Sequence, residues 1–433
     1  MSKKILDRTT LEEKLVWYGL ILSYPAYALG AMYILGSLIG WIILSVYLLR
    51  RFLDVDSQNA PLPILVWVWV LGMLSMELAL VQGHLNYDLG LAKIIKSTIG
   101  WAKGWALLAL FIALGAVLPL KRAIIPRACC VIGLHSLIFT ILSALAFIVG
   151  LPGEIYVSPL KVVGGPGPEY FELKLFGINP ETGLPRWQYF APWSPAIGLQ
   201  SCMLLILCLH ERNLTWKCLG VLGSFTMCCL AQSRAGWVIF FTILPMVFVF
   251  SRLHDPKILF ATAVAFVIVA LPGQVLIEQL QEMYQRIKES RPDSTRVRGG
   301  LANLAVQRWT SEAPVWGHGI VEPGPKYVER MMIGTHHSWY GLLFVKGLVG
   351  ALSLAIPLFI TAVYLLVKAQ RSKDARAALG ILVVLTVYSF FENLEILAYL
   401  YWPALLWLGA SLRVCDEKER DMNSDFTTSE VMT

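Results

Sequence analysis

The sequence predicts an all-α protein that crosses a membrane many times. Of its 433 residues, 57% are hydrophobic and only 15% are charged. The hydrophobic residues fall in runs close to the ~20 residues that an α-helix needs to cross the hydrocarbon layer. These runs lack the alternation of a membrane barrel, and a helix satisfies its own backbone hydrogen bonds in lipid. We therefore expect a polytopic bundle of about twelve transmembrane helices.

The expected helices follow from the apolar runs in order. Residues 1–14 are polar and lack the early apolar segment of a cleavable signal peptide, so we expect the first helix to direct insertion. Residues 15–49 are almost continuously apolar and fit a tight hairpin of two helices, broken near Tyr24 and Pro25. The later spans are expected at about 61–83, 101–120, 128–150, 193–210, 214–231, 235–252, 257–275, 347–368, 376–394 and 398–413.

The distribution of Lys and Arg orients these helices. Every short turn on one side is basic, as in the segment from Lys121 to Arg127, and this pattern marks the cytoplasmic side. Two long segments, 151–192 and 274–337, then face outward. We expect the first to be irregular and the second to contain short helices. The chain thus divides into residues 1–273 with nine helices, the outer segment 274–337, residues 338–415 with three helices, and a disordered cytoplasmic tail at 416–433.

Composition also limits the chemistry. The net charge is +7, but in a membrane protein the placement of cations matters more than their sum, so we expect no nucleic-acid partner. The eight cysteines lie in or beside apolar runs, which argues against disulfides and zinc sites. No nucleotide-binding glycine motif and no carboxylate spacing typical of a metal site occurs. We therefore expect neither metal nor cofactor.

Residues 334–340 read Gly-Thr-His-His-Ser-Trp-Tyr and lie where the second outer segment meets an apolar run. A histidine at a membrane surface is often a hydrogen-bonded structural residue. Two adjacent ones, His336 and His337, favour proton chemistry, because an imidazole can take a proton from a sugar hydroxyl near neutral pH.

Several arginines lie on the outward side, against the usual distribution of positive charge. Arg234 stands in a very short turn between two apolar runs, and Arg186 lies among aromatic residues at a similar expected depth. Each of them can simply contact lipid phosphate or solvent. Together they form a candidate clamp, since guanidinium groups bind phosphate oxygens in pairs. The other outward arginines are Arg286, Arg291, Arg296, Arg298 and Arg308.

These motifs resemble those of the bacterial O-antigen ligase family, which is related to O-antigen polymerases. The family has a histidine and a small polar residue, then a spaced Gly-x-x-Gly; here His337 and Ser338 precede Gly347 and Gly350. The spacing also admits His336, so the active histidine stays open between the two. We favour His337, because Ser338 then takes the polar position.

Two further motifs extend the resemblance. The family's Arg-x-x-x-Leu is matched by Arg186, with Phe190 in place of leucine. Its Ser and Arg before a helix that ends in Pro-x-x-Gly-x-Gly resemble residues 294–298 and 314–319, where either Arg296 or Arg298 can be the matching arginine.

The resemblance implies a glycosyltransferase of the bacterial inner membrane. Such an enzyme moves a glycan from undecaprenyl diphosphate to the lipid A core oligosaccharide during lipopolysaccharide biosynthesis, on the periplasmic side. It implies a fold like that of the metal-independent, lipid-carrier-dependent (GT-C type) glycosyltransferases. His337 or His336 would be the general base of an inverting reaction, and Arg186, Arg234, Arg296, Arg298 and Ser338 would bind the diphosphate and glycan.

Two other functions fit the sequence. A protein of the same fold can polymerise O-antigen repeats or attach glycans to a pilin. A transporter or flippase of a lipid-linked anion is a different class, in which arginines bind the substrate and histidines relay protons. Transport predicts ionisable residues deep in several helices around broken segments. Few occur here, such as Glu77, Lys346, Glu392 and Glu395, which favours surface chemistry.

Overall fold

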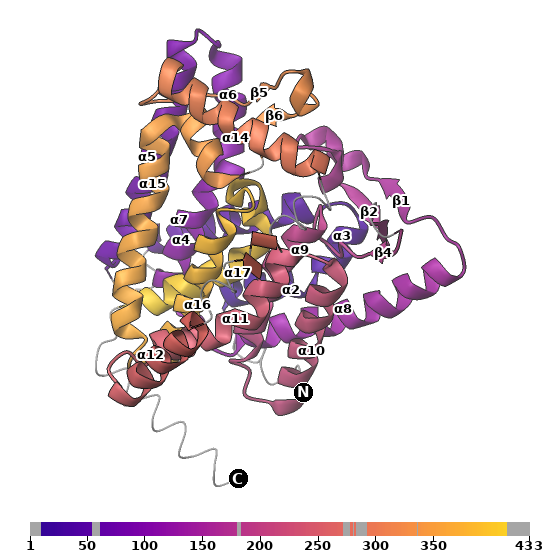
Figure 1. The fold of residues 1–433 in the computed structure, drawn as a ribbon, viewed down its shortest axis with the longest axis vertical. Coiled ribbons are helices and arrows are strands. Elements are labelled where there is room, and N and C mark those ends of the chain that lie inside the picture. Colours follow the sequence, from indigo (N-terminus) through magenta and orange to yellow (C-terminus); the bar gives the residue numbers. More distant parts are fainter. Residues whose placement is uncertain are drawn as a thin grey trace.

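The computed structural model describes residues 10–53, 61–179, 183–271, 278–279, 281–282, 292–335 and 337–413. Helices dominate this part of the chain (Figure 1). Seven of the described helices are long and apolar enough to cross a membrane, and three shorter apolar helices accompany them. The prediction of an all-α polytopic membrane protein is therefore confirmed. The count of twelve spans and the likeness to GT-C type enzymes stay predictions.

The first apolar run forms α2 (Leu11–Ile21), α3 (Ser23–Ala28) and α4 (Met32–Phe52). The hairpin turns at Gly30, whose φ of 63° suits a residue without a Cβ atom. A break between α2 and α3 at Leu22 lies close to the expected break at Tyr24 and Pro25, but the chain reverses only at Gly30. Pro25 lies in the first turn of α3, where its missing N–H group costs no hydrogen bond.

The next helices carry the chain out and back. They are α5 (Ile64–Asn86), α6 (Leu91–Lys103), α7 (Trp105–Val117) and α8 (Ile124–Ile148). Helix α6 lies at the top of Figure 1, beside α14, and joins α7 at Gly104. The segment after α8 was expected to be irregular, but it contains two small antiparallel sheets. Strand β1 (Glu154–Val157) pairs with β2 (Glu172–Lys174), and β3 (Gly177–Ile178) pairs with β4 (Pro185–Arg186).

The remaining elements place the two motif regions next to each other. Helices α9 (Ser194–Cys208), α10 (Leu214–Ala231), α11 (Arg234–Phe250) and α12 (Pro256–Ala270) lead to α14 (Pro292–Glu312). Strands β5 (Glu322–Pro323) and β6 (Met332–Ile333) pair after it, and α15 (Ser338–Lys368), α16 (Lys373–Tyr388) and α17 (Leu394–Leu412) follow. Helix α14 and strands β5 and β6 lie at the same end of the molecule as α6 (Figure 1).

Helix α17 lies at the centre of the bundle and packs closely on α7. Close approach of the two backbones needs small residues, as is common between membrane helices. A Cβ atom on Gly115 would lie 2.1 Å from the carbonyl oxygen of Leu406, and one on Gly409 would lie 2.0 Å from that of Ile112. These two glycines fix the position of α17, whose outer end borders the candidate site described below.

Helix α15 is broken at Gly347, which has φ 62° and ψ −158°. A Cβ atom there would lie 2.3 Å from the carbonyl oxygen of Val315, so both the backbone conformation and the space require glycine. The break leaves backbone groups of a membrane helix without helical partners, and residues 314–319 supply them. The carbonyl groups of Phe344 and Val345 accept from the N–H groups of His318 and Gly319, and the N–H groups of Leu348 and Val349 donate to the carbonyl groups of Pro314 and Val315, at 2.9 to 3.2 Å.

We expect labelling to show that α14 and the turn from α15 to α16 face opposite sides of the membrane. Helix α14 and the end of α15 near α12 lie at opposite ends of the molecule (Figure 1). Asn303 in α14 and Arg371 in the turn from α15 to α16 are both exposed. A membrane-impermeant thiol reagent should label a cysteine at Asn303 in intact spheroplasts. It should label one at Arg371 only after the membrane is permeabilised. The reverse pattern would invert the orientation that the basic turns predict.

Candidate functional site

A pocket of about 350 Å³ lies between α14 and the first turn of α15. His337 and Arg298 both line it, so the structure brings together two of the residues predicted from sequence. Phe390 and Phe391, from the turn between α16 and α17, close another side. The other lining residues are Gly299, Leu301, Ala302, Met332, Gly334, Tyr340 and Gly341. The pocket therefore combines an imidazole, a guanidinium group and an apolar wall.

His337 is the N-cap residue of α15. Its Nδ1 atom accepts hydrogen bonds from the N–H groups of Trp339 and Tyr340, at 3.1 and 3.4 Å. The ring also lies against the ring of Tyr340, with centroids 4.4 Å apart. Burial lowers the pKa of His337 below its ordinary value. A neutral ring that accepts at Nδ1 carries its proton on Nε2.

Ser338 holds the start of α15 against the start of α17. Its backbone N–H and its hydroxyl both donate to the carbonyl oxygen of Glu392, at 3.2 and 2.7 Å. The same hydroxyl accepts from the N–H group of Leu394 at 3.0 Å. Ser338 is only 1% exposed, so these contacts are internal. Its side chain thus positions His337 and does not line the pocket.

Glu392, which the sequence analysis named only among the few ionisable residues of the helices, lies next to the pocket residues Phe390 and Phe391. Its carboxylate accepts a hydrogen bond from Trp193 Nε1 at 3.0 Å, and it is 7% exposed. Burial raises the pKa of Glu392 to about 7, against the opposing effects of the nearby Arg298 and of Trp193. Its partner Trp193 lies 199 residues away in the chain, so no local motif marks this carboxyl group.

Arg186 and Arg234 lie near each other but do not line the pocket. The Arg186 guanidinium donates to the carbonyl oxygens of Ala231 and Gln232, at 2.9 and 3.4 Å. Burial lowers its pKa below the ordinary value for arginine. Arg234 begins α11 two residues after Gln232, so both arginines lie near the junction of α10 and α11. They form a second group of cations, separate from the residues that line the pocket.

Of the two candidate arginines of α14, only Arg298 lines the pocket. Arg296 donates to the carbonyl oxygen of Tyr327 at 3.0 Å and lies 3.6 Å from Glu329, with 55% of its side chain exposed. The structure thus distinguishes the two, although the sequence did not. His336 lies outside the described residues.

Three helices begin close together beside the pocket: α9, α15 and α17, which are connected through Glu392 and Leu394. Their first turns carry N–H groups without helical partners and the positive end of the helix dipole, which together favour anions. The contacts of Trp193 and Ser338 with Glu392 join α9, α15 and the α16–α17 turn. Within the described part of the chain, no three His, Cys, Asp or Glu residues are grouped to hold a metal. Metal independence stays a prediction for a chelator experiment.

A known protein family matches the part of the chain that contains several of these residues. Residues 219–355 match the family model described as O-antigen ligase, and they include Arg234, Arg298 and His337. A search of curated proteins found no match to the chain. The resemblance expected from the sequence is confirmed over residues 219–355, the part of the chain that matches the O-antigen ligase family model.

Proposed function

We propose that the protein transfers a glycan from undecaprenyl diphosphate to the lipid A core oligosaccharide, on the periplasmic face of the inner membrane. The observation that carries this proposal is the pocket shared by His337 and Arg298 within the family-matched residues. A general base and a cation for a departing diphosphate are the two groups that this transfer needs. The seven long apolar helices agree with two substrates that both sit in a membrane.

The reaction would be a single displacement with inversion at the anomeric carbon. The acceptor hydroxyl oxygen forms a bond to that carbon, while the bond from the carbon to the diphosphate oxygen breaks and its electron pair leaves with the diphosphate. The hydroxyl proton passes to the ring of His337. Arg298 stabilises the charge that develops on the diphosphate, so the proposed mechanism uses no metal.

The capping role of His337 adds a condition to this mechanism. A neutral ring that accepts the substrate proton at Nε2 must carry its own proton on Nδ1. In the structure, however, Nδ1 accepts hydrogen bonds from the N–H groups of Trp339 and Tyr340, so it cannot carry a proton in this position. Loss of an N-cap contact costs about 0.5–2 kcal/mol. General base catalysis contributes on the order of 10²–10⁴ in rate, so this cost is small. We propose that substrate binding turns the ring out of its capping position.

The pH dependence of the reaction should show the lowered pKa of His337. A lowered pKa keeps the ring neutral, and able to accept a proton, at more acidic pH. The acidic limb of kcat/KM should therefore lie below the ordinary histidine pKa of about 6.5. A limb above that value would contradict the assignment. Because the pKa of Glu392 is raised to about 7, the profile should be compared with that of Glu392→Gln.

Two alternatives remain distinct proposals. A polymerase, or a pilin ligase of the same fold, would use the same pocket with another acceptor. A transporter would use broken helices near the membrane centre, and α15 is broken at Gly347. The backbone groups at this break are bonded to residues 314–319, however, which favours a structural role for the break.

A cell-based experiment separates these functions. Deletion of the gene should leave lipopolysaccharide with core but no attached O-antigen, while the carrier-linked glycan accumulates at full length. Loss of chain length in the accumulated glycan would indicate the polymerase. Retention of the glycan on the cytoplasmic side would indicate the flippase. The wild-type gene should restore attachment, and one encoding His337→Asn should not.

A further inference from the structure

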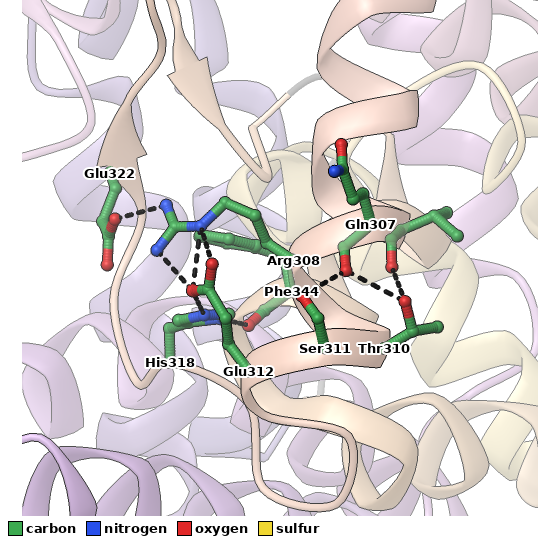
Figure 2. Close-up of polar contacts among 9 residues, drawn as sticks. Gln307, Arg308, Thr310, Ser311, Glu312, His318, Glu322 and Phe344 are labelled. Carbon is green, nitrogen blue, oxygen red and sulfur yellow. Dashed lines mark hydrogen bonds and ion pairs between the residues drawn. The ribbon is translucent and has the colours of Figure 1, made fainter.

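A cluster of ionic and hydrogen-bonding side chains lies outside the pocket, at the far end of α14 (Figure 2). Arg308 donates to Glu312 with its Nη2 atom at 2.7 Å and to Glu322 with its Nη1 atom at 2.6 Å. Glu312 also contacts the Nε2 atom of His318 at 2.8 Å. The cluster joins the last turn of α14 to the segment that precedes β5 and to β5 itself.

His318 connects this cluster to α15. Its Nδ1 atom lies 3.0 Å from the carbonyl oxygen of Phe344, which can only accept, so Nδ1 carries a proton. Its Nε2 atom faces Glu312, whose pKa is lowered to about 2 by Arg308 most of all and also by His318. Glu312 is therefore anionic and accepts as well. The two ring nitrogens of His318 therefore face two acceptors, one on α15 and one on α14.

The ring of His318 is also fixed by stacking. It lies between the ring of Phe344, with centroids 4.3 Å apart, and the ring of Tyr87, at 5.2 Å. Arg308 also lies over the ring of Phe344, with its guanidinium carbon 5.2 Å from the ring centroid. His318 is 1% exposed, which gives it one well-defined position. Tyr87 adds a contact to the turn between α5 and α6.

Helix α14 is also held by apolar packing along its length. Its apolar stripe consists of Val297, Leu301 and Ala305, which pack on a small separate core with Val328, Ile333 and Phe344. Arg298 lies between the first two of these residues, on the exposed side of the helix. Arg308 follows Arg298 by ten residues, or about 15 Å along a helix. The apolar stripe holds the helix near Arg298, and the cluster at Arg308 fixes its far end, so both attachments together determine where Arg298 lies over the pocket.

We propose that His318 is a positioning residue for the transfer reaction: through Glu312 and the carbonyl group of Phe344, it holds α14 against the outer half of α15 and keeps Arg298 opposite His337. This inference rests on the proposed function. It also assigns a role to the Pro-x-x-Gly-x-Gly segment, because residues 314–319 place His318 beside the break in α15.

The test is a double-mutant cycle between His318 and Arg298. His318→Phe keeps an aromatic ring between Tyr87 and Phe344 but removes both ring nitrogens and their contacts with Phe344 and Glu312. Side chains this far apart normally act independently, so coupling between them is diagnostic. His318→Phe should lower kcat by about tenfold or more in the wild-type background. In the Arg298→Ala background it should lower kcat by less than about twofold.

Controls separate positioning from loss of folding. Glu154→Gln changes an exposed carboxylate in β1, 3.8 Å from Lys174, and should leave kcat unchanged in both backgrounds. If His318→Phe folds poorly, Glu312→Gln replaces it in the test, because it weakens the same contact from the other side. It should show the same difference in kcat between the two backgrounds. Equal losses of kcat in both backgrounds would overturn the proposal and would leave the proposed function intact. If the wild-type protein itself shows no transfer, the result would instead count against the proposed function.

A second measurement tests the inference without activity. Spin labels at Asn303 in α14 and Leu348 in α15 report the distance between the two helices, since both side chains are exposed. The distance distribution should broaden in His318→Phe and in Glu312→Gln, but not in Glu154→Gln. An unchanged distribution in both cluster variants would overturn the positioning role, whatever reaction the protein catalyses.

Discussion

Replacement of His337 by alanine should lower the transfer rate by on the order of 10²–10⁴, the contribution of a general base. The imidazole lines the pocket and is the group there that can take the acceptor proton. KM for both substrates should change little, because the lost interaction belongs to the proton transfer and not to binding. Initial rates with purified protein and saturating donor would measure this.

The comparison must separate catalysis from helix capping, because His337 also caps α15. His337→Asn supplies the comparison, since asparagine is a strong N-cap residue but has no basic nitrogen. We expect Asn to restore thermal stability relative to Ala without restoring the rate. His254→Ala, an exposed histidine bonded to Gln370, should have no effect. Activity in His337→Asn near that of the wild type would show that the histidine only caps the helix.

Replacement of Arg298 by alanine should lower kcat by on the order of 10²–10³, as for loss of one group that stabilises transition-state charge. Arg298 is the α14 arginine that lines the pocket, and its charge also acts on the buried Glu392. Arg298→Lys should recover part of the rate, because lysine keeps the charge but not the paired donors of guanidinium. The effect should appear whether the acceptor is the lipid A core or a second carrier-linked glycan, since the diphosphate belongs to the donor.

Arg296→Ala is the matched control for this prediction. Arg296 lies on the same helix, but its guanidinium contacts the carbonyl group of Tyr327 and the exposed Glu329. Exposed ion pairs contribute about 0–1 kcal/mol, so its loss should change kcat by less than about fivefold. A larger effect of Arg296→Ala than of Arg298→Ala would show that the substrate reaches α14 from another side than the pocket.

The sequence predicted the helical bundle because long apolar runs and basic turns are local signals. It also predicted that a histidine at the start of α15 and an arginine of the outer segment belong to one site, and His337 and Arg298 do line one pocket. It could not choose Arg298 over Arg296. The two differ by their position around α14 relative to α15, which only packing determines.

Other features have no local signal at all. Glu392 owes its raised pKa to burial among residues that are remote in sequence, such as Trp193. The break in α15 at Gly347 and the bonding of residues 314–319 to it join two motifs across 26 to 34 residues. Glycines at both places hinted at unusual backbone, but the sequence alone did not indicate that the two segments bind each other.

The most direct test of the proposed function is transfer in vitro with purified protein, carrier-linked glycan and lipid A core in detergent, with a chelator present. The wild type should attach the glycan to the core acceptor. The His337→Asn and Arg298→Ala variants should do so far more slowly than the wild type. Lengthening of the donor glycan without use of the core would instead identify a polymerase. Absence of any transfer by folded wild-type protein would contradict the assignment of this pocket to glycan transfer.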